Sequence, residues 1–209
     1  MAFQVITIAR ECGSGGGTIA GLLGKRLGWS VLDHALISEV ARLAQVDART
    51  VERYDECIDS WLYRVSKRGL WHGAFEGVAT PVEASCFDAE TMAEIVARVM
   101  SEAADAGRCV IVGRGGQCIL QTRKDAFHVY VYAPLPERIR RLRQRLATET
   151  DLDLEEYIEA TDKRRSECIR LRFHQDRANH HLYHLMIGSS IGEDRVVDAV
   201  IAAMGKAGA

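Results

Sequence analysis

No apolar run in this 209-residue chain is long enough to cross a membrane. The apolar stretch at 3–8 is too short, and too close to the first residue, for the hydrophobic segment of a secretory signal peptide. Net charge is also small, at −2 from 27 basic and 29 acidic residues. We therefore expect a cytoplasmic protein that binds neither membranes nor nucleic acid, although a local basic cluster could still hold a small anion.

The six cysteines include no CxxC pair, so the spacing of a zinc ribbon is absent. Cys109 and Cys118 lie in apolar runs, which suits small buried hydrophobic side chains. This pattern favours reduced thiols over a disulfide scaffold. Histidines gather near the C-terminal end, but no cysteine or carboxylate spacing supports a metal site there, and we expect a polar tail. The histidines are His174, His180, His181 and His184.

Internal repeats and low-complexity linkers are absent as well, so we expect one domain over 1–209. Apolar runs rich in Val and Ile alternate with amphipathic patterns, which predicts a parallel α/β sheet with right-handed crossovers, covered on both faces. The expected strands are 3–8, 30–32, 109–112, 127–132 and, more weakly, 185–187. The expected helices are 18–27, 34–44, 89–106, 135–146 and 193–204. Two excursions interrupt the alternation: a helical segment at 48–88, and a basic helix with a polar tail at 153–182.

A glycine-rich loop from Arg10 to Gly17, RECGSGGG, follows the first expected strand and opens the next helix. Glycines let backbone N–H groups turn inward without Cβ interference, and a helix N-terminus adds positive partial charge, so together they form an anion cradle. We expect this loop to hold nucleotide phosphates, with a Ser14 or Thr18 hydroxyl reaching Mg²⁺. The alternative is a tight strand-to-helix turn without a ligand, which would not require four glycines in five residues. The candidate phosphate-binding residues are Gly13, Ser14, Gly15, Gly16, Gly17 and Thr18.

The loop keeps only the second glycine, Gly15, of the phosphate-loop pattern GxxxxGK[ST]. Arg10 stands in the position of the first glycine, and Gly16 stands in the position of the lysine. That lysine normally bridges the β- and γ-phosphates of the donor. Our hypothesis is that the Arg10 guanidinium replaces the missing lysine charge.

Other candidate residues follow later strands or lie on the basic helix. Asp33 ends the second strand, where open α/β sheets place ligand groups, and it could also cap the following helix. Arg114 follows the third strand, where it either binds phosphate or is a surface arginine. Arg165 and Arg172 share a helical face with Ile169, and they either neutralise transferred phosphate or face solvent.

Three aromatic residues, Trp61, Trp71 and Phe75, lie in the 48–88 segment. Such side chains are most often core or interface residues, and they could also stack on a nucleobase. The sequence therefore leaves open whether the protein forms a homo-oligomer.

The segment ITIARECGSGGGTIAGLLGKRLGWSVLDHALI resembles the N-terminal part of the cytidylate kinase-like family. Further similar segments follow in family order: CVIVGRGGQCIL, FHVYVYAPLPERIRRL, DKRRSECIRLRF and YHLMIGSSIGEDRVVDAVI. The resemblance covers nearly the whole chain except about 48–88. It implies a P-loop kinase-like, three-layer α/β/α fold with a five-stranded parallel sheet and a helical lid and acceptor-binding excursion.

The resemblance also implies phosphoryl transfer from Mg-ATP to a nucleoside monophosphate such as CMP, with Asp33 facing the nucleoside. Three departures bear on catalysis. Gly16 replaces the family's lysine, and Gly115 replaces the aspartate of its GRD motif. In the basic helix, which corresponds to the family's arm helix, only Asp162 and Arg165 keep a spacing related to the family's RDxxDxxR pattern. We therefore expect a nucleotide kinase with Arg10, Arg114, Arg165 and Arg172 as its cations. The alternative is a catalytically impaired, nucleotide-binding regulatory protein of the same fold.

Overall fold

A five-stranded parallel sheet forms the centre of the protein in a computed structural model, which describes residues 2–32, 89–146 and 151–205. Its strand order is β2-β3-β1-β4-β5. The strands are β1 (Val5–Arg10), β2 (Ser30–Leu32), β3 (Cys109–Val112), β4 (Ala126–Tyr132) and β5 (Leu185–Gly188). The expected fold class is confirmed. The strand that was predicted more weakly, at 185–187, is β5 and pairs with β4.

The helices connect the strands as crossovers, with two of them bounded as predicted. These two are α5 (Ala89–Ala106) and α7 (Leu135–Leu146). The other helices of the described residues are α1 (Gly16–Leu27), α6 (Gly116–Ile119), α8 (Asp151–Phe173), α9 (Glu193–Ala203) and the short 3₁₀ turns η1 (His180–Leu182) and η2 (Ser189–Ile191). The helix expected at 34–44 lies outside the described residues.

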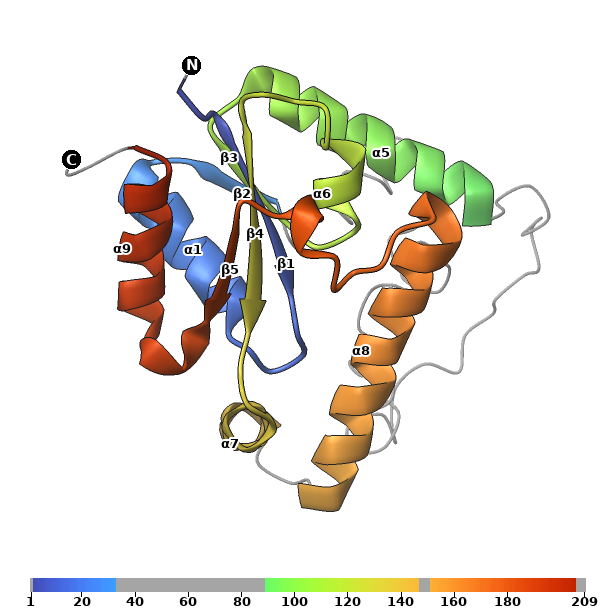
Figure 1. The fold of residues 1–209 in the computed structure, drawn as a ribbon, viewed down its shortest axis with the longest axis vertical. Coiled ribbons are helices and arrows are strands. Elements are labelled where there is room, and N and C mark those ends of the chain that lie inside the picture. The colour runs from blue at the N-terminus through green and yellow to red at the C-terminus, as the bar shows by residue number, and fades with distance from the viewer. Residues whose placement is uncertain (1, 33–88, 147–150, 206–209) are drawn as a thin grey trace, which may run out of the picture.

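The helices lie on both faces of the sheet, with α1 and α9 on one side and α5 and α6 on the other (Figure 1). Along β1, Ile6 and Ile8 join the core beneath α1 and α9, whereas Val5 joins the core beneath α5. Burial on both faces is why the strands are apolar at nearly every position. The arrangement also places the carboxyl ends of β1, β3 and β4 at one edge, next to α7 and α8 (Figure 1).

One polar pair lies within the sheet. The Thr7 hydroxyl of β1 and Nδ1 of His128 of β4 are 2.7 Å apart, and both side chains are buried. Burial, reinforced by the neighbouring His184 ring, lowers the pKa of His128 to about 4. The backbone N–H of His128 donates to Nδ1 of His184 at 3.0 Å, so that His184, expected in a polar tail, in fact packs against β4.

Of the two cysteines expected to be buried, Cys118 is free but only half-buried. Cys109 is buried and free, and burial raises the pKa of its thiol to about 11. Cys168 is disulfide-bonded, which departs from the expectation that reduced thiols are favoured.

Among the described residues, no helix combines the length and apolar character needed to span a membrane. Within the same ranges, no group of three His, Cys, Asp or Glu side chains is arranged to hold a metal ion.

Candidate functional site

The glycine-rich loop turns sharply between β1 and α1. Gly13 and Gly15 both adopt left-handed backbone conformations, with φ of 76° and 82°. A Cβ on Gly13 would lie 2.8 Å from the backbone oxygen of Arg138, so glycine also permits the close approach of α7. The Ser14 hydroxyl donates to the carbonyl of Glu11 at 2.9 Å and thereby closes the turn.

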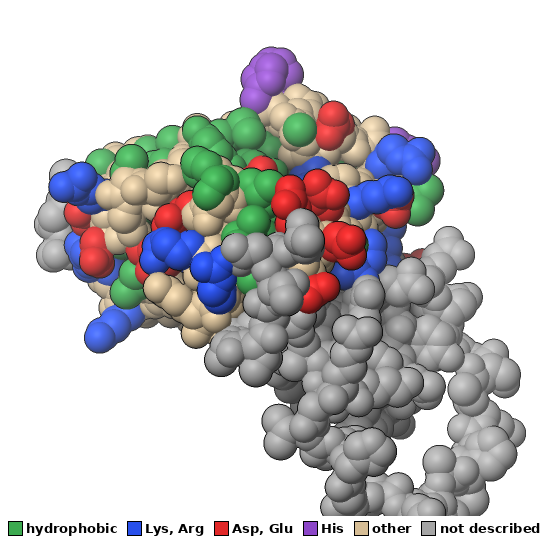
Figure 2. Space-filling view, turned by 90° about the horizontal axis from the view of Figure 1, so that it is seen from below, with side chains coloured by type: hydrophobic (Ala, Val, Ile, Leu, Met, Phe, Trp, Pro, Cys, Tyr) green, Lys and Arg blue, Asp and Glu red, His purple; other side chains and the backbone are tan. Residues whose placement is uncertain are grey.

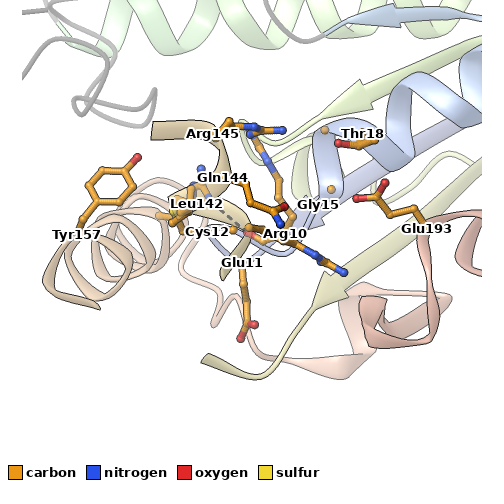
Figure 3. A pocket seen from close by; sticks show the side chains of 15 residues that line it. Arg10, Glu11, Cys12, Gly15, Thr18, Leu142, Gln144, Arg145, Tyr157 and Glu193 are labelled. Carbon is orange, nitrogen blue, oxygen red and sulfur yellow. Dashed lines mark hydrogen bonds between the residues drawn. The ribbon is translucent and has the colours of Figure 1, made fainter. Parts of the chain in front are cut away.

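A pocket of about 510 Å³ opens above this loop (Figure 3). Its volume lies within the range of about 300–1,000 Å³ that is usual for small-molecule sites. It contains every predicted phosphate-binding residue except Ser14. In Figure 3, Thr18 and Glu193 lie on one side, and Tyr157 of α8 lies on the opposite side. The lining residues are Arg10, Glu11, Cys12, Gly13, Gly15, Gly16, Gly17, Thr18, Arg141, Leu142, Gln144, Arg145, Tyr157, Arg165 and Glu193. We call this the loop pocket.

Two of the departures from the phosphate-loop pattern, Arg10 and Gly16, fit together in space. A Cβ on Gly16 would lie 2.7 Å from Cβ of Arg10 and 2.9 Å from its Cγ. A Cβ on Gly113 would overlap Nη1 of Arg10. The Arg10 side chain therefore runs across Gly16 toward the end of β3. An arginine at position 10 in this conformation requires a glycine at position 16.

A second, smaller pocket of about 40 Å³ lies between the ends of β1 and β3 and helix α8. We call this the arginine pocket. Its lining residues are Ala9, Arg10, Gly113, Arg114, Gly115, Gln117, Arg165, Cys168, Ile169 and Arg177. Arg114 has a left-handed backbone with φ of 55°, which is strained for a residue with a side chain.

The structure thus brings together three of the four predicted cations. Arg10 and Arg165 line both pockets, and Arg114 lines the smaller one. Arg172 lines neither, although Ile169 on its helical face is buried as expected. Asp33 lies outside the described residues.

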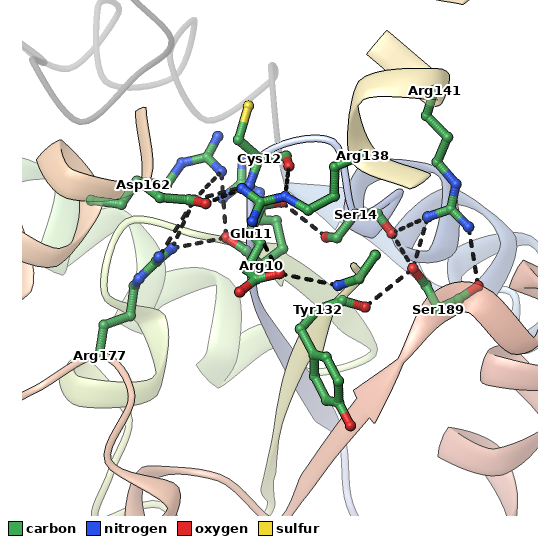
Figure 4. A network of polar contacts seen from close by, with 12 residues as sticks. Arg10, Glu11, Cys12, Ser14, Tyr132, Arg138, Arg141, Asp162, Arg177 and Ser189 are labelled. Atoms are coloured by element: carbon green, nitrogen blue, oxygen red, sulfur yellow. Dashed lines mark hydrogen bonds and ion pairs between the residues drawn. The ribbon is translucent and has the colours of Figure 1, made fainter. Parts of the chain in front are cut away.

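Asp162 of α8 connects the arm helix to the glycine loop (Figure 4). Its Oδ1 accepts from the backbone N–H of Cys12 at 2.9 Å, and its other oxygen pairs with Arg138. Nη1 of Arg177 lies 3.4 Å from Oδ1, and Nη1 of Arg165 lies 3.9 Å from it. One carboxylate therefore holds three largely buried guanidiniums, those of Arg138, Arg165 and Arg177, which we call the arginine cluster.

Two members of the arginine cluster also bind the backbone of Arg10. The Nη1 groups of Arg165 and Arg177 donate to its carbonyl oxygen at 3.3 and 3.1 Å. The Arg177 guanidinium lies 5.8 Å from the centre of the Tyr130 ring, a cation–π distance. Arg177 was missed in the sequence because it falls in an irregular polar segment, where a charge usually faces solvent.

Arg141 of α7 joins the glycine loop to the turn after β5 (Figure 4). Its Nη1 donates to the Ser14 carbonyl and to Oγ of Ser189, both at 2.7 Å, and its Nη2 donates to the Ser189 carbonyl at 3.0 Å. The Ser189 hydroxyl also donates to the Ser14 carbonyl at 2.6 Å. These bonds hold the curvature of the loop, and no local sequence pattern indicates them.

A family model described as "Cytidylate kinase-like family" matches residues 5–191. Among curated proteins, none matches the chain significantly. Similar solved structures include an uncharacterised protein from Eubacterium ventriosum ATCC 27560, with a TM-score of 0.69 and 16% identity over 97% of this chain and 98% of that one. A shikimate kinase from Bacteroides thetaiotaomicron has a TM-score of 0.55 and 13% identity, with 97% and 98% covered. A gluconokinase from Sinorhizobium meliloti 1021 has a TM-score of 0.56 and 8% identity, with 97% and 92% covered.

Proposed function

The chain belongs to the cytidylate kinase-like family, and from that premise we propose that it is a kinase that transfers the γ-phosphate of ATP to a small acceptor. One observation carries the proposal: Arg10 and Arg165 line both the loop pocket and the arginine pocket. A phosphoryl group that passes from a donor in the first pocket to an acceptor in the second would travel between these two guanidiniums. In the loose transition state of phosphoryl transfer, negative charge is spread over the equatorial oxygens of the transferred group and builds on the leaving oxygen, and fixed cations stabilise that charge.

The loop pocket suits the donor. Its glycines leave the backbone open where Cβ atoms would intrude, and the Thr18 side chain is exposed in the first turn of α1. Mg²⁺ bound with the nucleotide would supply charge neutralisation between the phosphates, and Thr18 is the better-placed hydroxyl because that of Ser14 donates within the loop. No protein nucleophile is required, since positioning and electrostatics account for this chemistry.

The acceptor we propose first is a nucleoside monophosphate such as CMP, on the strength of the family. Shikimate and gluconate also deserve a test, because two proteins of similar fold are described as a shikimate kinase and a gluconokinase. A coupled assay of ATP consumption over these acceptors, with and without Mg²⁺, tests the proposal. We expect acceptor-dependent ADP release with at least one of them.

A second candidate is a nucleotide-binding regulatory protein with impaired catalysis. Gly16 in place of lysine and Gly115 in place of the GRD aspartate favour it. ATP or ADP should raise the melting temperature under either reading, because a ligand at 100 times its Kd stabilises the folded state by about 2.7 kcal/mol. Stabilisation without turnover on any acceptor would select the regulator, and the absence of any shift would defeat both.

A further inference from the structure

Strand β5 forms an uncharged edge of the sheet. It is the last strand in the order β2-β3-β1-β4-β5, and Figure 1 shows it in front of β4. From 178 to 192 the sequence contains no Asp, Glu, Lys or Arg, and β5 itself has neither a proline nor a bulge. Soluble proteins usually protect an edge strand with such features, because an unprotected edge pairs with another strand. The edge at β5 is therefore suited to pairing.

The outward backbone groups of β5 follow from the hydrogen bonds of its neighbour. The N–H of Glu11 donates to the Val131 carbonyl at 3.0 Å, so Val131 turns its carbonyl toward β1 and Tyr132 turns its own toward β5. In a parallel pair, a residue bonds to the chain neighbours of the residue opposite, whose own N–H and C=O point away. Gly188 lies opposite Tyr132. The N–H of Gly188 and, two residues earlier, the N–H and C=O of Met186 therefore point outward, and no described residue bonds to them.

Apolar side chains are exposed beside the same edge. Figure 2 shows hydrophobic side chains gathered along the upper margin of the molecule. Three of the four exposed large hydrophobic residues in the described ranges lie at the end of β4, in β5 or in η2: Tyr132 at 42%, Met186 at 37% and Ile191 at 49%. A Cβ on Gly188 would lie 3.3 Å from Cε2 of Tyr132. The glycine thus leaves room for the Tyr132 ring to cover the last residue of the edge strand.

We propose that β5 pairs with β5 of a second copy of this chain, in antiparallel orientation, about a two-fold axis that crosses the sheet near Ile187. In this register the outward N–H of Gly188 in each copy faces the carbonyl of Met186 in the other. Met186 of one copy then lies beside Gly188 of the other, so its thioether packs on the Tyr132 ring that covers this glycine. Each contact occurs on both sides of the axis, which makes the edge self-complementary.

The charge pattern favours a second copy over a foreign strand. Two-fold symmetry brings each residue near the axis close to its own counterpart, so a charged edge would repel itself, and 178–192 has no Asp, Glu, Lys or Arg. A charged partner would find no opposite charge on this stretch. The proposal does not depend on phosphoryl transfer, because neither Met186 nor Gly188 lines the loop pocket or the arginine pocket.

Sedimentation velocity of the full chain over a range of concentrations tests the proposal, and we expect a dimer that dissociates on dilution. Met186→Glu places a carboxylate against the Tyr132 ring of the other copy and should raise the dissociation constant of the dimer about tenfold or more. Leu171→Glu is the matched control, because Leu171 is also an exposed hydrophobic residue, at 66%, but lies on α8. It should dimerise as the wild type does.

Two variants at Gly188 test the backbone bond separately from the side chains. The φ of Gly188 is −79°, which suits proline, and Gly188→Pro removes the outward N–H without breaking a bond to β4. Gly188→Ala introduces the same Cβ and keeps the N–H. We expect Gly188→Pro to dimerise about tenfold more weakly than Gly188→Ala, because it loses a hydrogen bond on each side of the axis.

Hydrogen exchange identifies what covers the edge. We expect the amides of Met186 and Gly188 to exchange fast in dilute protein and slowly in concentrated protein. Slow exchange in a monomer at every concentration would mean that a segment of the chain itself covers β5, and fast exchange in a persistent monomer would leave the edge to another partner or to solvent; both results overturn the proposal. A dimer that survives Met186→Glu and Gly188→Pro, or one that Leu171→Glu abolishes, would place the interface elsewhere and overturn it as well.

Discussion

Substitutions at positions 10 and 16 test whether Arg10 has taken over the charge of the missing lysine. Arg10→Ala removes a guanidinium from the boundary of the two pockets. Loss of one preorganised group of this kind typically lowers turnover about 10²–10³-fold, or about 3–4 kcal/mol in the barrier. We expect a loss of that size in kcat/KM. Arg195→Ala, at an exposed position of α9, should leave kcat/KM unchanged.

Restoring the lysine alone should destabilise the protein. In Gly16→Lys the new Cβ would lie 2.7 Å from Cβ of Arg10, where ordinary contacts are 3.4–4 Å. Overpacking at a buried site costs about 1–3 kcal/mol. For a chain of this size, each kcal/mol lowers the melting temperature by about 2–4 °C, so we expect a decrease of about 2–12 °C. The double variant Arg10→Gly/Gly16→Lys removes the overlap and should recover most of that stability.

Melting curves and the coupled ATP assay on the wild type, Arg10→Gly, Gly16→Lys and the double variant complete the cycle. A value of kcat/KM within threefold of wild type in Arg10→Ala would refute the role of its charge. A double variant as unstable as Gly16→Lys would refute the steric argument.

Three further changes probe the scaffold. The free energy of unfolding should be greatest above pH about 6.5 and fall by about 3 kcal/mol as the pH drops toward about 4, because His128 binds a proton over this range in the unfolded chain but not in the folded protein. Urea titrations should show a flatter pH profile for His128→Gln, and an equal slope would contradict this. Gly115→Ala should cost roughly 2–5 kcal/mol in urea unfolding, since φ is 74° and the new Cβ would overlap Phe173. Gly21→Ala, in an open helical position, should instead be neutral or stabilising, and equal losses would exclude the steric cause. Asp162→Asn removes the carboxylate that the three guanidiniums of the arginine cluster share, while Glu11 still lies 3.4 Å from Arg138. We expect it to destabilise the protein by about 3 kcal/mol, and a change below about 1 kcal/mol would show that the Asp162 carboxylate is dispensable.

Periodicity was enough to place most of the scaffold. Helix α7 was predicted with its observed bounds, because it begins directly after Pro134 and its apolar residues recur at helical spacing up to Leu146. The strand predicted at 3–8 instead runs from Val5 through Arg10, since pairing with β4 extends to Arg10 opposite Val131. Strand pairing depends on the neighbouring strand, so the composition of one segment does not locate its end.

Prediction of the site succeeded where residues directly follow strands. Arg10 and Arg114 were found because the carboxyl ends of parallel strands meet at one edge of the sheet. Arg177 binds the Arg10 carbonyl from 167 residues away, and Gln117 follows a glycine loop in which nothing marks its burial. Such contacts arise from tertiary packing, and one sequence alone does not encode them as a pattern.

The bonds from Arg141 and Ser189 to the Ser14 carbonyl have a thermodynamic consequence for nucleotide binding. Ordering a loop usually consumes about 1–2 kcal/mol of conformational entropy for each residue fixed. Here side chains from α7 and η2 already hold the loop in its curved form, so that cost is met during folding rather than during binding. Ser189 does not line the loop pocket, so we expect nucleotide affinity to fall in Ser189→Ala chiefly through a less favourable binding entropy, with little change in the contacts that the phosphates make.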